Sequence, residues 1–296
     1  MIAVPLKVLM IGNSFSICVL NYAPPVAKDL GCGLDIASLY IGGCSLERHS
    51  ANIAAGGYGD FAPYLVTWNF ASLENQEDAP FTSTLKCDVD GYGKKTFHGN
   101  IPAMLAAEKW DIVTIQQASH ESWRPESFYP WADIVVSEVR KHAPQAKIMI
   151  QQTWSYCNGD GRICNQTTGG AGSWGFDQSG MFTRLSANYG KLAEKFGAGI
   201  IPTGDAIQRF RAALPVKGVD DDVVGNMRKE NGHYVGDSIH LNRDGDYLQA
   251  CVWVATLFGA DLSKLGWAPE KEMRHPENAA LIRKCAAEAV GGLAGK

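Results

Sequence analysis

Short apolar runs alternate along the chain with longer segments of helical periodicity. The apolar runs are Val8–Ile11, Ile36–Tyr40, Ile112–Ile115, Ile148–Ile150 and Ile200–Ile201. Runs of this length between helical segments are typical of strands in a parallel sheet that helices cover on both faces. The pattern therefore predicts a three-layer α/β/α sandwich with a central parallel sheet of about five strands.

Four segments have the features of helices. The clearest is Phe128–His142, which has apolar residues at helical spacing, basic residues in its last turn and Pro144 beyond its end. Positive charge suits the C-terminal end of a helix, and proline cannot continue one. Ser186–Phe196 and Tyr247–Phe258 are each followed by glycine, a common helix stop. Asn278–Val290 is predicted as a C-terminal helix.

Two stretches break this alternation. Residues from about 50 to 100 are rich in Gly, Tyr, Asn and Asp, and hold two β-like stretches, Leu65–Phe70 and Phe81–Leu85. The Gly-rich stretch Tyr156–Gly180 is a long loop of the kind that often carries function. We therefore expect a single domain over residues 1–296, with an insertion at about 50–100 and a C-terminal helix at about 278–290.

The charge pattern narrows the range of partners. Lys and Arg total 27 against 31 Asp and Glu, and the basic residues are scattered. Nucleic acid is not an expected partner, because it requires a clustered positive field. No apolar stretch has the length of a bilayer, so no membrane partner is expected either. Lys7–Gly12 already forms the first strand, which predicts a cytoplasmic protein, or a periplasmic or secreted one if a leader has been removed.

The eight cysteines do not have the spacing of a metal finger, and together with the histidines they offer no zinc site. We therefore expect neither a metal nor another cofactor. Cys157 and Cys164 flank a short Gly-rich loop and could pair in an oxidising compartment. Their closeness in sequence does not by itself fix the geometry that a disulfide needs.

The first candidate for chemistry follows the first strand, where residues 12–16 read Gly-Asn-Ser-Phe-Ser. Ligands of open parallel sheets bind beyond the carboxyl ends of the strands, and Ser14 lies at such an end. Backbone N–H groups at the start of the following helix can stabilise negative charge there. Ser14 is therefore either a nucleophile or a simple helix cap.

The second candidate lies in a predicted polar loop before the last long helix, where residues 236–242 read Gly-Asp-Ser-Ile-His-Leu-Asn. The carboxylate of Asp237 can fold back onto the imidazole of His240, three residues later. It would then hold the tautomer whose other nitrogen faces a nucleophile, which is the role of the acid in a catalytic triad. This pair favours Ser14 as the nucleophile.

The two motifs together resemble the SGNH (GDSL-like) hydrolase superfamily. That family has its serine in a Gly-Asp-Ser-like first block and its acid and base in an Asp-x-x-His fifth block, in the same order. The resemblance extends from Lys7 to about Gly259, and is greatest to a branch whose first block reads Gly-Asn-Ser-Phe-Ser. It implies a flavodoxin-like sandwich and a catalytic triad of Ser14, Asp237 and His240.

The same resemblance suggests an oxyanion hole. After the second strand the chain reads Tyr-Ile-Gly-Gly-Cys-Ser-Leu, and Gly43 is the expected donor there, with the N–H of Ser14 as another. The family's third block has an Asn as third donor. The corresponding segment of this chain, residues 115–122, contains no Asn. The amide of Gln117, or of Gln116, could replace it on a longer arm, and His120, at the position of the Asn, is the rival.

Aromatic and polar residues at this edge of the sheet suggest a sugar-binding pocket, because rings with polar neighbours suit the faces of a carbohydrate. The expected substrate-binding residues are Asn13, Arg48, His49, His120, Trp123, Trp154, Tyr156 and Trp174. We therefore expect a carboxylic ester hydrolase that works through an acyl-enzyme. Its expected partner is a small-molecule or oligosaccharide ester, and its expected reaction removes acetyl or another small acyl group from a carbohydrate. The alternatives are a lipase or thioesterase for longer acyl chains, and a catalytically silent carbohydrate-binding protein of the same fold.

Overall fold

The central sheet follows the predicted apolar runs. The computed structural model describes residues 4–56, 61–70, 86–87, 93–214 and 219–294. Within these ranges one eight-stranded sheet has the order β4-β5-β3-β2-β1-β6-β7-β8. Each of the five predicted runs lies in a parallel strand, namely β1 (Leu6–Gly12), β2 (Leu34–Tyr40), β6 (Ile112–Ile115), β7 (Lys147–Gln151) and β8 (Gly199–Ile201). This confirms the α/β fold with its five parallel strands, in a flavodoxin-like order.

The segment from about 50 to 100 extends the same sheet. Antiparallel strands β3 (Tyr64–Phe70), β5 (Gly93–Gly99) and β4 (Lys86–Cys87) continue it beyond β2. The β-like stretch Leu65–Phe70 lies in β3, and Phe81–Leu85 lies outside the described residues.

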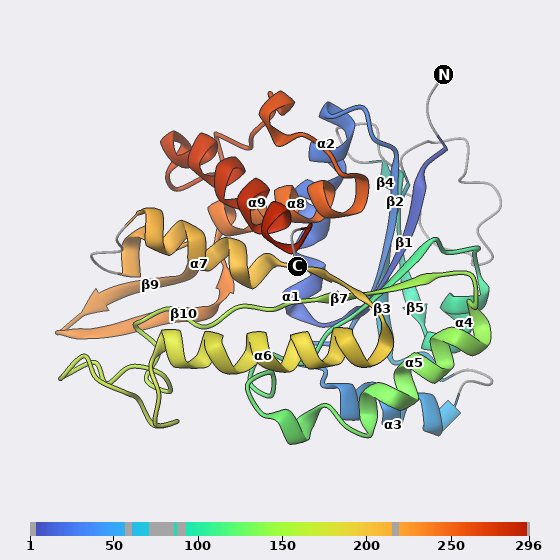
Figure 1. Ribbon diagram of the computed structural model, residues 1–296, viewed down its shortest axis with the longest axis horizontal. Coiled ribbons are helices and arrows are strands. Elements are labelled where there is room, and N and C mark those ends of the chain that lie inside the picture. The colour runs from blue at the N-terminus through green and yellow to red at the C-terminus, as the bar shows by residue number, and fades with distance from the viewer. Residues whose placement is uncertain (1–3, 57–60, 71–85, 88–92, 215–218, 295–296) are drawn as a thin grey trace.

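Helices cover both faces of the sheet (Figure 1). One layer holds α2 (Val19–Asp29), α7 (Thr203–Ala213), α8 (Arg243–Phe258) and α9 (Ala279–Ala294). The other holds α3 (Leu46–Gly56), α4 (Ile101–Ala106), α5 (Trp131–His142) and α6 (Gln178–Phe196). Short 3-10 turns cover Pro125–Ser127, Val219–Asp221, Leu262–Lys264 and Pro276–Asn278.

The start of α8 shows why its bounds differ from those expected. The side chain of Asn242 accepts hydrogen bonds from the N–H groups of Asp244 and Gly245, so it caps the helix. The helix therefore begins at Arg243, four residues before the predicted Tyr247. In the same way Asp177 caps α6, which begins at Gln178 rather than at Ser186.

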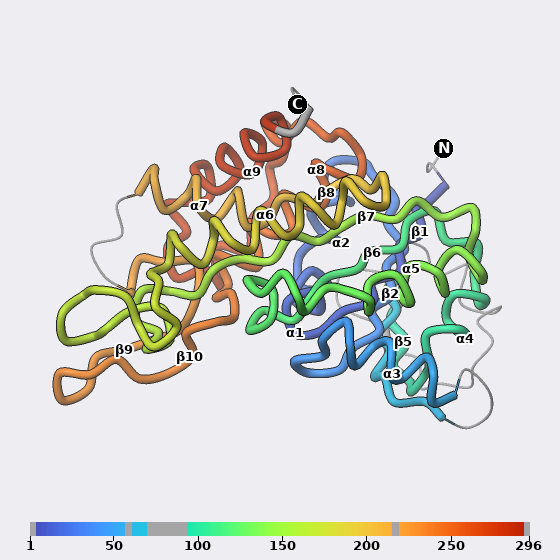
Figure 2. Tube along the Cα trace, turned by 60° about the horizontal axis from the view of Figure 1, so that its bottom comes forward, coloured from blue at the N-terminus to red at the C-terminus, as the bar shows by residue number. Residues whose placement is uncertain are grey.

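An antiparallel hairpin, β9 (Val224–Glu230) and β10 (His233–Leu241), lies apart from the main sheet. Figure 2 shows it beside the long loop that follows β7, which contains the stretch Tyr156–Gly180. The two segments are joined by hydrogen bonds, among them Cys157 N–H to Ser238 O at 3.0 Å and Tyr234 N–H to Gln166 Oε1 at 3.1 Å. The hairpin and the loop together build one wall above the carboxyl ends of the parallel strands.

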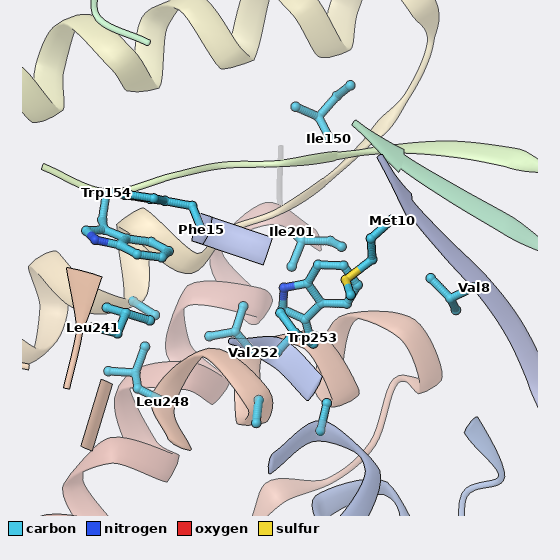
Figure 3. Packing of buried hydrophobic residues seen from close by; sticks show 14 of the residues in the cluster. Val8, Met10, Phe15, Ile150, Trp154, Ile201, Leu241, Leu248, Val252 and Trp253 are labelled. Atoms are coloured by element: carbon cyan, nitrogen blue, oxygen red, sulfur yellow. The ribbon is translucent and has the colours of Figure 1, made fainter. Parts of the chain in front are cut away.

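The hydrophobic core lies between the sheet and the helices, and it reaches the residue after Ser14. Phe15 and Trp154 are almost fully buried and stack with ring centroids 4.2 Å apart (Figure 3). The indole N–H of Trp154 donates to Ile239 O at 2.9 Å. This stack therefore joins the helix after β1, the loop after β7 and the segment that carries His240.

Candidate active site

Ser14 lies at the first turn of α1 (Ser14–Ile17), directly beyond the carboxyl end of β1. The side chain of Asn13 caps this turn by accepting from Phe15 N–H at 3.0 Å. Glycine is needed at position 12, because a Cβ there would overlap the side chain of Ser16. The strand can therefore turn sharply into the helix and leave the Ser14 side chain half-buried at its start.

Asp237 and His240 lie where the pairing of β10 with β9 becomes irregular, between Asp237 and Leu241. The segment is therefore the distorted end of a strand rather than the loop that the sequence suggested. Asp237 Oδ1 accepts from the N–H groups of Ile239 and His240, at 2.9 and 3.0 Å. These bonds fold the segment back so that Asp237 Oδ2 lies 2.7 Å from His240 Nδ1.

The three candidate side chains form one hydrogen-bonded chain. His240 Nε2 lies 2.9 Å from Ser14 Oγ, across 226 residues of sequence. Partial burial would raise the pKa of Asp237, but the backbone N–H groups of His240 and Ile239 and the imidazole outweigh it, so the pKa falls below its usual value. Asp237 is therefore ionised at neutral pH, and His240 Nδ1–H must donate to it. With Nδ1–H directed at Asp237, Nε2 is the nitrogen that can accept the proton of the Ser14 hydroxyl.

Ser14 and His240 line a pocket of about 500 Å³. Its apolar lining comes from Phe15, Tyr40, Tyr156 and Ile239, and its polar lining from Asn13, Ser119, His120 and Arg162. The backbone of Gly42 and Gly43 completes it. The volume is in the range of small-molecule sites.

The backbone N–H groups of Ser14 and Gly43, both residues of the pocket lining, are the expected oxyanion donors. Gly43 has φ +60°, a conformation that glycine adopts without strain. Neither its N–H nor that of Ser14 donates to an acceptor within the described part of the chain. The structure therefore places both expected backbone donors at the pocket.

Neither glutamine lies at the pocket, contrary to expectation. Gln117 is fully buried, and its Nε2 donates to Ser127 O at 2.7 Å and to Ser127 Oγ at 3.1 Å. Its Oε1 accepts from the N–H groups of Leu46 and Ala118. Gln117 is therefore a brace between loops, and a side chain held at both ends cannot turn to an oxyanion.

Gln116 and Asn13 form the frame of the pocket. Gln116 Nε2 donates to Asn13 Oδ1 at 2.8 Å, and Asn13 Nδ2 donates to Cys44 O at 2.9 Å. The chain of bonds ties the turn after β1 to the loop that carries Gly43. Gln116 therefore orients Asn13 rather than a substrate. Of the three candidates for the third donor, His120 is the one that lines the pocket.

Several expected substrate-binding residues lie elsewhere. Trp154 and His49 are fully buried, the first against Phe15 and the second against Tyr64, whose hydroxyl lies 2.8 Å from His49 Nδ1. Trp123 packs on Trp174 in an aromatic cluster beside the pocket lining. The remaining residues divide as follows: Arg48 is exposed on α3, while Asn13, His120 and Tyr156 line the pocket.

Four residues that line the pocket were not predicted from the sequence: Arg162, Tyr40, Ser119 and Ile239. Arg162 lies in the Gly-rich loop, whose irregular course hides its direction. Ser119, Ile239 and Tyr40 are close in sequence to predicted site residues. Their position at the ends of strands is the sequence signal that indicates them.

The described residues also bear on the predictions about a disulfide, a metal site and a membrane-spanning helix. Cys157 and Cys164 are free, and the buried Cys157 thiol lies 3.3 Å from the sulfur of Met227. In the described ranges no three His, Cys, Asp or Glu side chains gather as possible metal ligands. No helix of the described chain has the length and apolarity needed to cross a membrane.

Comparison with known proteins places this chain in a family. A family model described as "Domain of unknown function (DUF4886)" matches residues 68–289. A DUF4886 family protein from Bacteroides uniformis has a similar structure, with a TM-score of 0.72 and 28% identity over 97% of this chain and 95% of that one. A protein from Slackia heliotrinireducens described as "a putative SGNH hydrolase" matches with a TM-score of 0.50 and 22% identity, over 86% of this chain and 100% of that one. No curated protein matches the sequence.

Proposed function

The chain belongs to the DUF4886 family and has an SGNH-hydrolase-like fold, and from this premise we propose that it is a serine ester hydrolase. The observation that carries the proposal is the hydrogen-bonded chain from Ser14 through His240 to Asp237. A helix-capping serine would need no imidazole at 2.9 Å, and an exposed histidine would need no ionised carboxylate behind it.

The proposed reaction has two steps. His240 Nε2 takes the proton of Ser14 while Oγ bonds to the ester carbonyl carbon, and the backbone N–H groups of Ser14 and Gly43 stabilise the oxyanion. The C–O bond to the alcohol then breaks, and the alcohol leaves with the proton from His240. Water loses a proton to His240 and attacks the acyl-enzyme; the bond from the acyl carbon to Oγ then breaks, His240 returns the proton to Ser14 Oγ, and the acid leaves.

We further propose that the acyl group is small, acetyl first, and that the alcohol is a carbohydrate. The pocket supports this because its lining combines polar groups from Ser119, His120 and Arg162 with the aromatic ring of Tyr156. Trp123, Trp154 and Trp174 do not line the pocket. A lipase or thioesterase would need an apolar trough in place of these groups, and a silent binder would not need the hydrogen-bonded triad.

Hydrolysis of 4-nitrophenyl esters of increasing chain length tests this proposal. We expect the acetate to be hydrolysed fastest and Ser14→Ala to lose the activity. Ser14→Ala with wild-type activity would refute the nucleophile, and a maximum at long chains would favour the lipase. Binding of acetylated oligosaccharides without turnover of any ester would favour the silent binder.

A further inference from the structure

Arg162 is a cation fixed at the wall of the pocket. Its Nε donates to Asp160 Oδ1 at 2.8 Å, and its Nη2 donates to Asp160 Oδ2. Asp160 is 4% exposed and also accepts from the Ser238 hydroxyl at 2.6 Å. The carboxylate therefore points into the protein and holds one edge of the guanidinium in place.

Two aromatic rings fix the plane of the same guanidinium. Its central carbon lies 4.4 Å from the ring centroid of Tyr156 and 5.4 Å from that of Trp174. The hydroxyl of Tyr156 in turn lies 3.0 Å from Ser119 Oγ. A guanidinium that a carboxylate holds along one edge and aromatic rings hold on its face loses little further conformational freedom when it binds a ligand.

The outer edge of Arg162 has donors to spare. A guanidinium has five N–H groups, and Asp160 takes two of them. Among the hydrogen bonds of the described residues, none comes from Nη1. The side chain is 39% exposed and lines the pocket, whereas its carboxylate partner is buried. The positive end of the ion pair is therefore toward the pocket. There the N–H groups of Nη1 and the second N–H of Nη2 form a pair of donors that fits a carboxylate.

The carboxylates nearest the pocket, Asp160 and Asp237, lie outside its lining and are paired with Arg162 and His240. No Asp or Glu is among the described residues that line it. The nearby carboxylates Glu47, Glu121 and Glu126 line a neighbouring cavity of about 290 Å³, which shares His120 with the pocket. Arg162 does not line that cavity. An anionic group would therefore be directed to the Arg162 end.

We infer that Arg162 is a specificity-determining residue that binds a carboxylate on the alcohol part of the substrate, so that the preferred esters are those of acidic sugars. The inference rests on the proposed function: the acyl group is small, so a carboxylate has to be on the alcohol. A charge-assisted, two-point hydrogen bond of this kind supports a preference of roughly 10- to 100-fold in kcat/KM over a neutral isostere.

The test compares two matched substrates, an O-acetylated glucuronic acid and the corresponding O-acetylated glucuronamide, by the acetate that each releases. We expect wild type to prefer the acid by roughly 10- to 100-fold. Arg162→Gln should reduce the ratio of the two kcat/KM values to about one. Arg162→Lys should keep part of the preference, because it retains the charge but loses the fork.

A matched control is Arg184→Gln, since Arg184 is exposed, lies 4.8 Å from the Phe176 ring and does not line the pocket. It should keep the wild-type ratio. Equal wild-type rates on acid and amide would overturn the inference, and so would an Arg162→Gln variant that loses both activities equally. If wild type hydrolyses neither sugar but cleaves 4-nitrophenyl acetate through Ser14, the inference fails while the proposed serine ester hydrolase stands.

Discussion

The buried histidine on α3 predicts a specific pH dependence of stability. His49 is fully buried, and burial lowers its pKa from 6.5 to about 3, with the nearby Arg48 as a lesser cause. The folded protein therefore keeps this imidazole neutral, whereas the unfolded chain protonates it below pH 6.5. The contribution of His49 to the free energy of unfolding is fully present above pH 6.5 and is lost as the pH falls toward 3. Between pH 7.5 and 4.5 the loss is about 2 to 3 kcal/mol, at about 1.4 kcal/mol per pH unit below 6.5.

Urea denaturation of wild type and His49→Gln, at pH values from 7.5 to 4.5, measures this loss. The variant should start less stable, because it disturbs the contact with Tyr64, but its curve should lack the 2 to 3 kcal/mol decline assigned to His49 above. His233→Gln, at an exposed hairpin position, is the control and should decline as wild type does. Parallel declines for wild type and His49→Gln would show that the residue is not kept neutral by the fold. An increase of KM for 4-nitrophenyl acetate in His49→Gln would indicate instead that His49 contributes to substrate binding.

Three further substitutions test separate parts of the account. Asp237→Asn should lower kcat for 4-nitrophenyl acetate by roughly 10³- to 10⁴-fold with little loss of stability, because it leaves His240 in the wrong tautomer; activity near wild type would exclude Asp237 as the acid. Gln117→Ala should lower the free energy of unfolding by about 1 to 3 kcal/mol through its lost loop contacts, while kcat falls by much less than the roughly 10²-fold loss of an oxyanion donor. Trp154→Ala should cost about 3 to 5 kcal/mol in urea denaturation, and a stable variant with weakened ester binding would place Trp154 in the pocket instead.

The strands and the two motifs could be predicted because they depend on short stretches of sequence. Each buried parallel strand is a continuous apolar run, and the ends of such strands meet at one edge of the sheet. Ser14 follows directly from the end of β1. The Asp-x-x-His spacing lets Asp237 meet His240 within one turn of chain, as the 2.7 Å contact shows.

The remainder depends on side-chain contacts that neither periodicity nor residue type predicts. The direction of the Gln117 amide is set by Ser127, in a turn that the sequence does not place beside it. Residue type alone does not distinguish a tryptophan in the core from one in a pocket, and Trp154 is in the core because Phe15 lies against it. Arg162 is aimed by Asp160 inside an irregular loop, for which periodicity carries no information.

α2 illustrates a local signal that tertiary packing overrides. Pro24 and Pro25 lie inside this helix, where proline lacks the N–H of the helical hydrogen bond and normally ends a helix. The apolar face of the helix is nevertheless buried, with Val19, Ala23 and Val26 fully covered. Its packing against α8 offsets the local cost.

Covalent trapping tests the central claim most directly. The protein would be treated with a fluorophosphonate, which bonds to an activated serine, and the adduct would be located by mass spectrometry of the digested chain. We expect one adduct on Ser14, parallel loss of 4-nitrophenyl acetate hydrolysis, and strongly slowed labelling in His240→Ala. Labelling at another serine, or continued hydrolysis with Ser14 fully modified, would contradict that claim.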